Sequence, residues 1–95
     1  MAVGVVIQFS GGTTAQYDQV IEKMGFKPSG AGAPGLMFHW ITETPDGLRV
    51  TDVWESREQF DKFAQEQIGP FTQEVGIPGP PDITYHEVYN YLTAG

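Results

Sequence analysis

Two histidines, His39 and His86, are the residues of this sequence best suited to acid–base chemistry near neutral pH. His39 is the stronger candidate, because the chain between it and Asp52 has the pattern of a hairpin that could bring the two side chains together. A carboxylate fixes the tautomer of an imidazole and increases its basicity, as a general base requires. We therefore predict His39 and Asp52 as a catalytic pair, with a structural polar pair as the alternative. His86 has no acidic residue on its face of the last predicted strand, and it is assigned only to substrate binding.

The register of this hairpin decides whether the two side chains can meet. A turn with two or four loop residues would put His39, Asp52 and Trp54 on one face of the sheet. With a four-residue loop, Thr44 to Gly47, His39 lies directly opposite Asp52, and Met37 lies opposite Trp54. Directly opposed side chains have Cβ atoms roughly 5 Å apart, which lets an imidazole meet a carboxylate. A three-residue loop with a bulge would separate the pair.

Two aromatic residues could form walls of a cavity beside this pair. Trp54 ends a predicted strand at a strand-to-helix junction, near the open edge of a sheet–helix core. Tyr17 belongs to the apolar stripe of the first predicted helix and could direct its hydroxyl into the same cavity. Ordinary core packing is the alternative for both residues. We predict that they bind the substrate, a small apolar or aromatic molecule.

Other kinds of site are disfavoured by the composition and by the spacing of the polar residues. The chain has no cysteine, and its histidines show no local ligand spacing such as H-x-H or H-E-x-x-H, so no metal and no cofactor is predicted. Five basic residues against twelve acidic ones argue against binding to nucleic acid. Residues 30–35 (GAGAPG) match G-x-G-x-x-G by letter, but they follow a predicted helix and precede a strand, the reverse of a dinucleotide-binding loop. The absence of a long apolar segment and of a signal-peptide pattern predicts a cytoplasmic protein that makes no membrane contact.

Hydrophobic periodicity predicts a single domain, residues 1–95, with the element order β-α-β-β-α-β. Capping boxes are expected to begin the helices at Thr13 and Ser56, and Gly25 and Gly76 are expected to end them. Gly69-Pro70 predicts a kink or a new short helix within the second helix. The strands are expected at residues 3–9, 36–43, 48–55 and 83–92.

This order predicts an α+β, ferredoxin-like subunit, with both helices on one face of a four-stranded antiparallel sheet. The other face also carries large apolar residues, because the second strand is apolar in both phases. Leu36, Phe38 and Trp40 are expected on one side, and Met37 and Ile41 on the other. Exposure of such an apolar surface to water is unfavourable, so a second copy of the chain is expected to cover it in a homodimer.

The run TDVWESREQFDKF, residues 51–63, together with this element order, resembles the dimeric α/β-barrel superfamily. The closest resemblance is to its branch of small bacterial proteins that are similar to antibiotic-biosynthesis monooxygenases, and V-W-E-S-x-E-x-F is its most recognisable part. The resemblance implies two ferredoxin-like sheets paired face to face, with a pocket between sheet and helices in each subunit. It covers proteins that oxidise aromatic polyketides without metal or flavin, haem-degrading proteins, isomerases and decarboxylases. The haem-degrading members use a histidine on the second helix as the iron ligand. Residues 56–75 contain no histidine, which argues against haem binding.

The leading functional hypothesis is therefore a small cofactor-independent enzyme that acts on an aromatic or polyketide-like molecule. His39, oriented by Asp52, would abstract a proton from a phenol or an activated C–H group, while Trp54 and Tyr17 line the pocket. The resulting anion could react with oxygen, as in a monooxygenase, or rearrange, as in an isomerase or cyclase. The alternative is a non-catalytic small-molecule-binding or stress-associated protein of the same fold.

Overall fold

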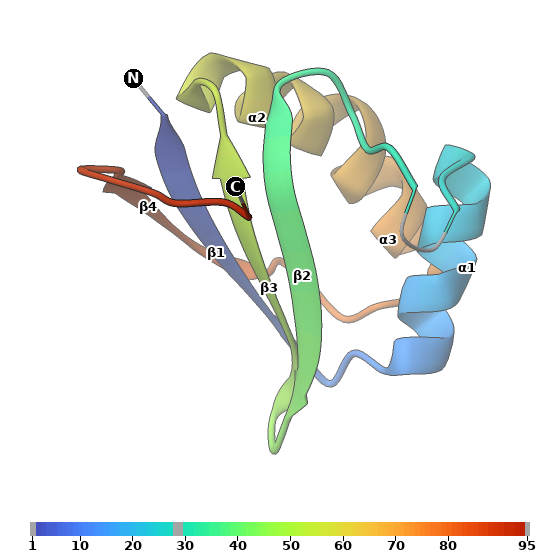
Figure 1. Ribbon diagram of the computed structural model, residues 1–95. Coiled ribbons are helices and arrows are strands. Elements are labelled where there is room, and N and C mark those ends of the chain that lie inside the picture. The colour runs from blue at the N-terminus through green and yellow to red at the C-terminus, as the bar shows by residue number, and fades with distance from the viewer. Residues whose placement is uncertain (1, 28–29, 95) are drawn as a thin grey trace.

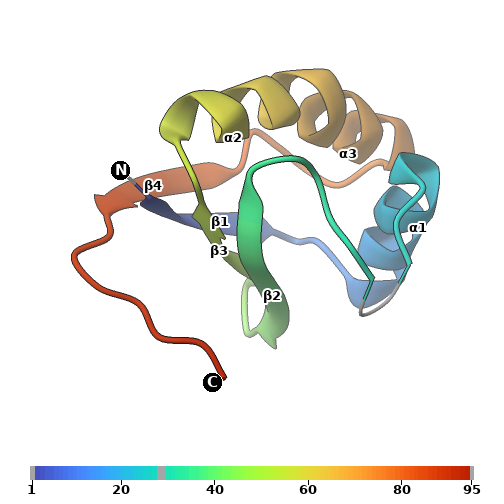
Figure 2. The ribbon, with the colours of Figure 1, turned by 45° about the horizontal axis from the view of Figure 1, so that its top comes forward.

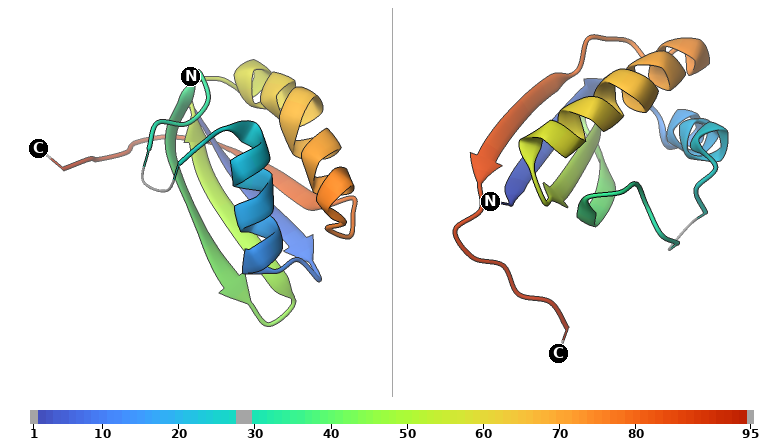
Figure 3. Two further views of the ribbon diagram at one scale, coloured as in Figure 1. Left: turned by 90° about the vertical axis from the view of Figure 1, so that its right-hand side faces the viewer. Right: turned by 90° about the horizontal axis from the view of Figure 1, so that it is seen from above.

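The computed structural model describes residues 2–27 and 30–94, and its elements follow the predicted order β-α-β-β-α-β (Figure 1). The four strands form one antiparallel sheet in the order β2-β3-β1-β4, and all helices lie on one side of it (Figure 3). This is the ferredoxin-like arrangement that the sequence predicts. The strands are β1 (Val3–Ser10), β2 (Leu36–Thr44), β3 (Gly47–Trp54) and β4 (Asp82–Glu87). The helices are α1 (Thr14–Met24), α2 (Arg57–Phe63) and α3 (Gly69–Val75), with a π-helical turn, η1 (Ala64–Ile68), between α2 and α3.

Both ends of α1 are fixed by the residues expected to fix them. The hydroxyl of Thr13 accepts a hydrogen bond from the backbone N–H of Gln16, and the Gln16 side chain accepts one from the backbone N–H of Thr13. This reciprocal pair is the predicted capping box. Gly25 ends the helix with a φ of 82°, a left-handed conformation that glycine adopts without strain.

The second helical segment is continuous but changes its hydrogen-bond pattern. Ser56 caps α2 by accepting from the backbone N–H of Gln59, whereas the Gln59 side chain bonds to the carboxylate of Glu55. Only half of the predicted capping box is therefore present. The interruption predicted at Gly69-Pro70 takes the form of the π turn, in which the Gly69 N–H bonds to the carbonyl of Ala64. The turn shifts the register by one residue directly before a proline that has no N–H to donate.

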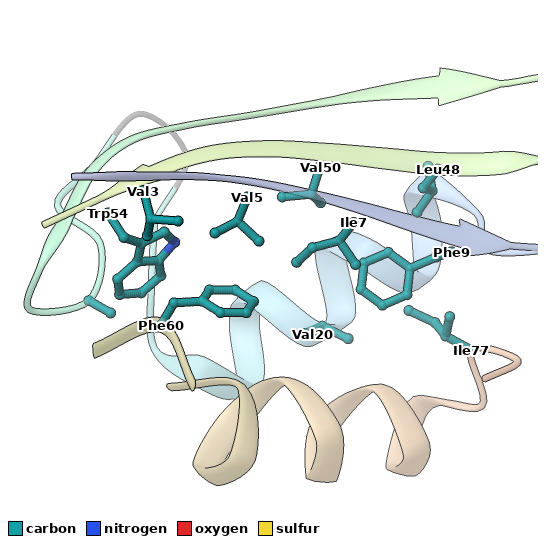
Figure 4. Close-up of a cluster of buried hydrophobic side chains, with 11 residues drawn as sticks. Val3, Val5, Ile7, Phe9, Val20, Leu48, Val50, Trp54, Phe60 and Ile77 are labelled. Atoms are coloured by element: carbon teal, nitrogen blue, oxygen red, sulfur yellow. The ribbon is translucent and has the colours of Figure 1, made fainter. Parts of the chain in front are cut away.

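The core lies between the sheet and the helices, as Figure 4 shows. Alternate residues of β1 and β3 point toward the helices, where Val20 of α1 and Phe60 of α2 meet them. Trp54 and Phe60 are fully buried and pack edge to face, with ring centroids 5.6 Å apart. Such aromatic pairs contribute more than their buried area alone. The strand residues of this core are Val3, Val5, Ile7, Phe9, Leu48, Val50 and Trp54.

The opposite face of the sheet carries large apolar side chains that the subunit itself does not cover. Phe38 is 61% exposed and Trp40 is 49% exposed. Leu36, which was expected beside them, instead lies opposite Trp54 on the helix side, because a β-bulge inserts Met37 as an extra residue in β2. The expected pairing of Met37 with Trp54 is therefore wrong. A bulge reverses the phase of the residues beyond it.

The last strand is shorter than predicted. The sequence predicts a strand over residues 83–92, but β4 ends at Glu87. Its neighbour β1 begins at Val3, opposite Glu87, and beyond this pair the Val88 N–H donates a backbone hydrogen bond to the carbonyl of Ala2. Residues 88–94 then leave the sheet on the side away from the helices, where Tyr89 and Leu92 are exposed (Figure 2). None of the helices in the described part of the chain is long and apolar enough to cross a bilayer.

Candidate active site

The β2–β3 hairpin brings His39 directly opposite Asp52. Thr44 pairs with Gly47, so the loop consists of Pro45 and Asp46 alone. A two-residue loop gives the same pairing as the predicted four-residue loop. The shorter loop adds one residue to the end of each strand, Thr44 and Gly47, and so leaves the register unchanged. Both side chains point to the helix side of the sheet, as Trp54 does two residues farther along β3.

Hydrogen bonds join four side chains at this point. His39 Nδ1 lies 2.6 Å from Asp52 Oδ1, and His39 Nε2 lies 2.6 Å from the hydroxyl oxygen of Tyr17 on α1. The indole Nε1–H of Trp54 donates to Asp52 Oδ2 over 3.0 Å. The structure thus brings together Tyr17, His39, Asp52 and Trp54, all of which the sequence singles out.

With Asp52 ionised and the His39 ring neutral, the donor and acceptor roles of these groups follow from their chemistry. An ionised carboxylate accepts hydrogen bonds and donates none, so the two oxygens of Asp52 take protons from Trp54 Nε1–H and His39 Nδ1–H. In the neutral imidazole, Nε2 then carries the lone pair and accepts from the Tyr17 hydroxyl. The side chain of Asp52 is 5% exposed and that of His39 is 29% exposed, so the carboxylate lies behind the imidazole and away from water.

The environment of Tyr17 keeps its hydroxyl protonated. Burial raises the pKa of Tyr17 to about 12, and the negative charges of Asp52 and Asp18 add to the effect. At neutral pH the phenol therefore remains a donor to His39. The tyrosine and histidine rings lie nearly parallel, with their centroids 6.0 Å apart and their planes 10° from parallel.

Tyr17 should make the folded protein sensitive to alkaline pH. Since its pKa rises from 10.0 to about 12 on folding, the folded state retains a proton that the unfolded chain loses in this range. Its stabilising contribution is complete below the unfolded pKa and is lost as the pH rises through the folded pKa. We expect the urea midpoint of wild type to fall more steeply than that of Tyr17→Phe over this range, and parallel curves would contradict the assignment.

A cavity of about 580 Å³ opens beside the four joined side chains. Side chains from β2, β3, α1 and the helices opposite form it, and residues 30–33 border it as a loop. Tyr17, His39, Asp52 and Trp54 all contribute to its lining. The remaining surface is chiefly apolar and includes Ile21, Met24, Phe26, Leu36, Phe63 and Ile68. A pocket of this kind suits a small aromatic or apolar ligand with one polar group.

His86, the other predicted substrate-binding residue, does not reach this cavity. It lies opposite Gly4 on the open face of the sheet, is exposed, and has its Nε2 3.3 Å from the Thr84 hydroxyl. The strand alternation turns Tyr85 toward the helices and His86 away from them. The assignment of His86 to the same site is therefore corrected.

Two charged residues at the cavity were not anticipated from the sequence. Asp18 and Lys27 both contribute to its lining and are exposed. Asp18 directly follows Tyr17, and Lys27 directly follows Phe26. Neither belongs to the apolar stripe of the first helix, so the sequence pattern did not identify them as cavity residues. Among the residues that the structure describes, no group of three or more histidine or acidic side chains is arranged to hold a metal ion.

The bond between Trp54 and Asp52 should contribute to stability. We expect Trp54→Phe to lower the free energy of unfolding by about 2–4 kcal/mol, because it removes a hydrogen bond to a buried charge and leaves unfilled space at a fully buried position. Denaturant unfolding of the wild type, Trp54→Phe, Asp52→Leu and the double variant measures the coupling between the two side chains, because leucine offers the indole no acceptor. Strictly additive losses would contradict a direct contribution of the bond.

Comparison with known proteins supports the fold. No protein-family model and no curated sequence matches the chain. Rv0793 from Mycobacterium tuberculosis superposes with a TM-score of 0.66 at 17% identity, over 98% of this chain and 100% of that one. The monooxygenase ActVA-Orf6 of Streptomyces coelicolor, in complex with Nanaomycin D, gives 0.56 at 19% identity over 99% and 92%. SnoaB, a cofactor-independent oxygenase from Streptomyces nogalater, gives 0.58 at 16% identity over 98% and 97%. The chain thus shares its ferredoxin-like subunit fold with these solved structures, and the predicted resemblance is confirmed at the level of fold.

Proposed function

We propose that this protein is a small cofactor-independent enzyme that acts on an aromatic or polyketide-like molecule. The reaction is a base-assisted oxidation, as in a monooxygenase, or a rearrangement through the same anion. The observation that carries this proposal is the hydrogen-bonded chain of Tyr17, His39 and Asp52 at the wall of an apolar cavity. A neutral imidazole held by a buried carboxylate is the usual arrangement of a general base.

The apolar lining favours electron-rich aromatic substrates. The cavity volume of about 580 Å³ lies within the range of small-molecule sites and can hold fused rings. Two proteins of the same fold point in the same direction: ActVA-Orf6 was crystallised in complex with Nanaomycin D, and SnoaB is a cofactor-independent oxygenase. The ligand of ActVA-Orf6, Nanaomycin D, supports the proposed substrate class.

Oxidation of an anthrone illustrates the chemistry that a base alone could promote. Removal of one proton, from the central methylene carbon or from the ring hydroxyl of the enol tautomer, gives the same electron-rich anion, which transfers one electron to molecular oxygen. The two radicals combine into a carbon–oxygen bond, and a returned proton gives the hydroperoxide. Loss of the second methylene hydrogen, with cleavage of the O–O bond, releases water and leaves a quinone. One oxygen molecule is consumed, and the protein supplies only proton transfers.

The test uses dithranol, a dihydroxyanthrone, with wild-type protein in the presence of EDTA. Oxygen uptake and quinone absorbance are followed together against the autoxidation without protein. We expect an acceleration of about a hundredfold or more, from general-base catalysis, with one oxygen consumed per quinone formed. A rearranged product formed without oxygen would support the isomerase form of the proposal.

The competing function is storage or sequestration of the same kind of ligand. Its signature is a bound aromatic compound that is recovered unchanged after prolonged incubation, with and without oxygen. That outcome across a panel of anthrones, naphthols and hydroxyquinones would overturn the enzyme proposal.

We further propose that two copies pair through the open faces of their sheets. Phe38 and Trp40 present their side chains on this face, and the extended tail of residues 88–94 leaves the subunit on the same side. An apolar surface of this kind is typical of an interface. Its burial between identical faces would give a closed two-fold dimer.

Charging this face should separate the copies. We expect sedimentation velocity to show a dimer for wild type and a monomer for Trp40→Asp, because an aspartate cannot be buried there without a partner. Gln19→Asp, an equal change of charge at an exposed position on α1, should remain dimeric. A monomeric wild type at micromolar concentration would contradict the proposed dimer.

A further inference from the structure

Both nitrogens of the His39 ring are occupied in this structure. Nδ1 is bonded to Asp52, and the lone pair of Nε2 is taken by the Tyr17 hydroxyl at 2.6 Å. The imidazole therefore presents no free nitrogen to the cavity. A ligand could contact Nε2 only by displacing the hydroxyl of Tyr17, a residue held on α1.

The hydroxyl oxygen of Tyr17, in contrast, can still accept a hydrogen bond. A phenolic hydroxyl donates one hydrogen bond and can accept another, and the donor position of Tyr17 is used by His39. Tyr17 lines the cavity and is only partly buried. The unused acceptor of the hydrogen-bonded chain is thus on tyrosine and not on histidine.

We propose that Tyr17 is the catalytic residue that contacts the hydroxyl of the ligand, and that His39 acts through it. This inference rests on the proposed function. The ligand O–H bond breaks as a new bond forms between that proton and the Tyr17 oxygen. At the same time the original proton of Tyr17 passes to His39 Nε2. The result is a ligand anion and an imidazolium beside the Asp52 carboxylate, while tyrosine stays neutral. The reverse shift returns the proton to the product, and no electrons leave or enter the protein.

The Tyr17 oxygen should determine which ligands the site prefers. The site should prefer aromatic ligands with a ring hydroxyl that can donate to Tyr17 over ligands of the same shape that lack one. The preference should depend on the Tyr17 oxygen. It should depend much less on the nitrogen of His39, because the ligand does not touch that atom.

The test compares the affinities of α-naphthol and α-methylnaphthalene by equilibrium dialysis, so that it does not require turnover. The naphthol preference is the ratio of the two affinities. We expect Tyr17→Phe to lower this ratio about three- to tenfold, the effect of one lost hydrogen bond. Direct contact of the ligand with His39 predicts the opposite sign, since removal of the tyrosine hydroxyl would free Nε2 for the naphthol. A preference that is unchanged or increased in Tyr17→Phe overturns the inference, as does a wild type with no naphthol preference.

A second variant separates the two residues. In His39→Gln the side-chain amide oxygen can accept a hydrogen bond from the Tyr17 hydroxyl. The naphthol preference should therefore stay within about twofold of wild type, while turnover is lost. A loss of preference in His39→Gln equal to that in Tyr17→Phe would place the ligand on histidine and overturn the inference. Absence of turnover in wild type would count against the proposed function alone, because the affinity ratios still decide the role of Tyr17.

Discussion

Replacement of His39 by glutamine is expected to reduce turnover about 10²–10⁴-fold, the usual contribution of a general base. Glutamine keeps a polar side chain that can bond to Asp52 or Tyr17, but an amide cannot take up a proton at neutral pH. The loss should appear in kcat, because the cavity wall and the ligand contacts remain. Initial rates of quinone formation from dithranol measure it.

Glu43→Gln is the matched control for this variant. Glu43 is exposed, lies on the same strand β2 and does not line the cavity, so its replacement should leave the rate within about twofold of wild type. Circular dichroism and the denaturant midpoint show whether both variants are folded. A folded His39→Gln protein that retains wild-type kcat would remove His39 from the mechanism.

Asp52→Asn should be at least as damaging, because it changes the tautomer of His39. The Trp54 indole can only donate, so it must bond to the amide oxygen of asparagine and turn the amide NH₂ toward His39 Nδ1. His39 is then held with its proton on Nε2, where it donates to Tyr17 and has no lone pair left for a proton. We expect kcat to fall about 10³- to 10⁴-fold, as the same substitution does in a serine-protease triad.

A paired measurement distinguishes this mechanism from simple unfolding. The affinity for α-methylnaphthalene should change little in Asp52→Asn, because this ligand forms no hydrogen bond with Tyr17, His39 or residue 52. The nitrogen spectrum of His39 should switch from the Nδ1–H form to the Nε2–H form. Full activity together with the switched tautomer would show that the orientation of His39 does not matter for the reaction.

The sequence predicts well those features that depend on neighbours along the chain. The capping box at Thr13 and the left-handed end at Gly25 follow from local spacing and are observed. The pairing of His39 with Asp52 is equally local, because a short turn with an even number of loop residues fixes the register of a hairpin.

The features that the sequence does not predict depend on contacts between distant segments. The bond from Tyr17 to His39 requires a particular placement of α1 on the sheet, which periodicity does not specify. The strand predicted to continue to residue 92 stops at Glu87 because β1 begins at Val3, and the alternation of its side chains continues beyond the last available partner. The bulge at Met37 leaves no mark in the apolar pattern, since β2 is apolar in both phases.

The most direct test of the proposed chemistry is the protonation of His39 when a phenol binds. The chain has only two histidines, so a two-bond ¹H–¹⁵N correlation spectrum can be assigned with His86→Gln. In the free protein we expect a neutral ring with its proton on Nδ1. Addition of nitrophenol, an acidic phenol, should convert His39 to imidazolium while the bound phenol shows the absorbance of its anion. A neutral His39 ring beside a fully bound phenol would contradict the general-base role on which the proposed function depends.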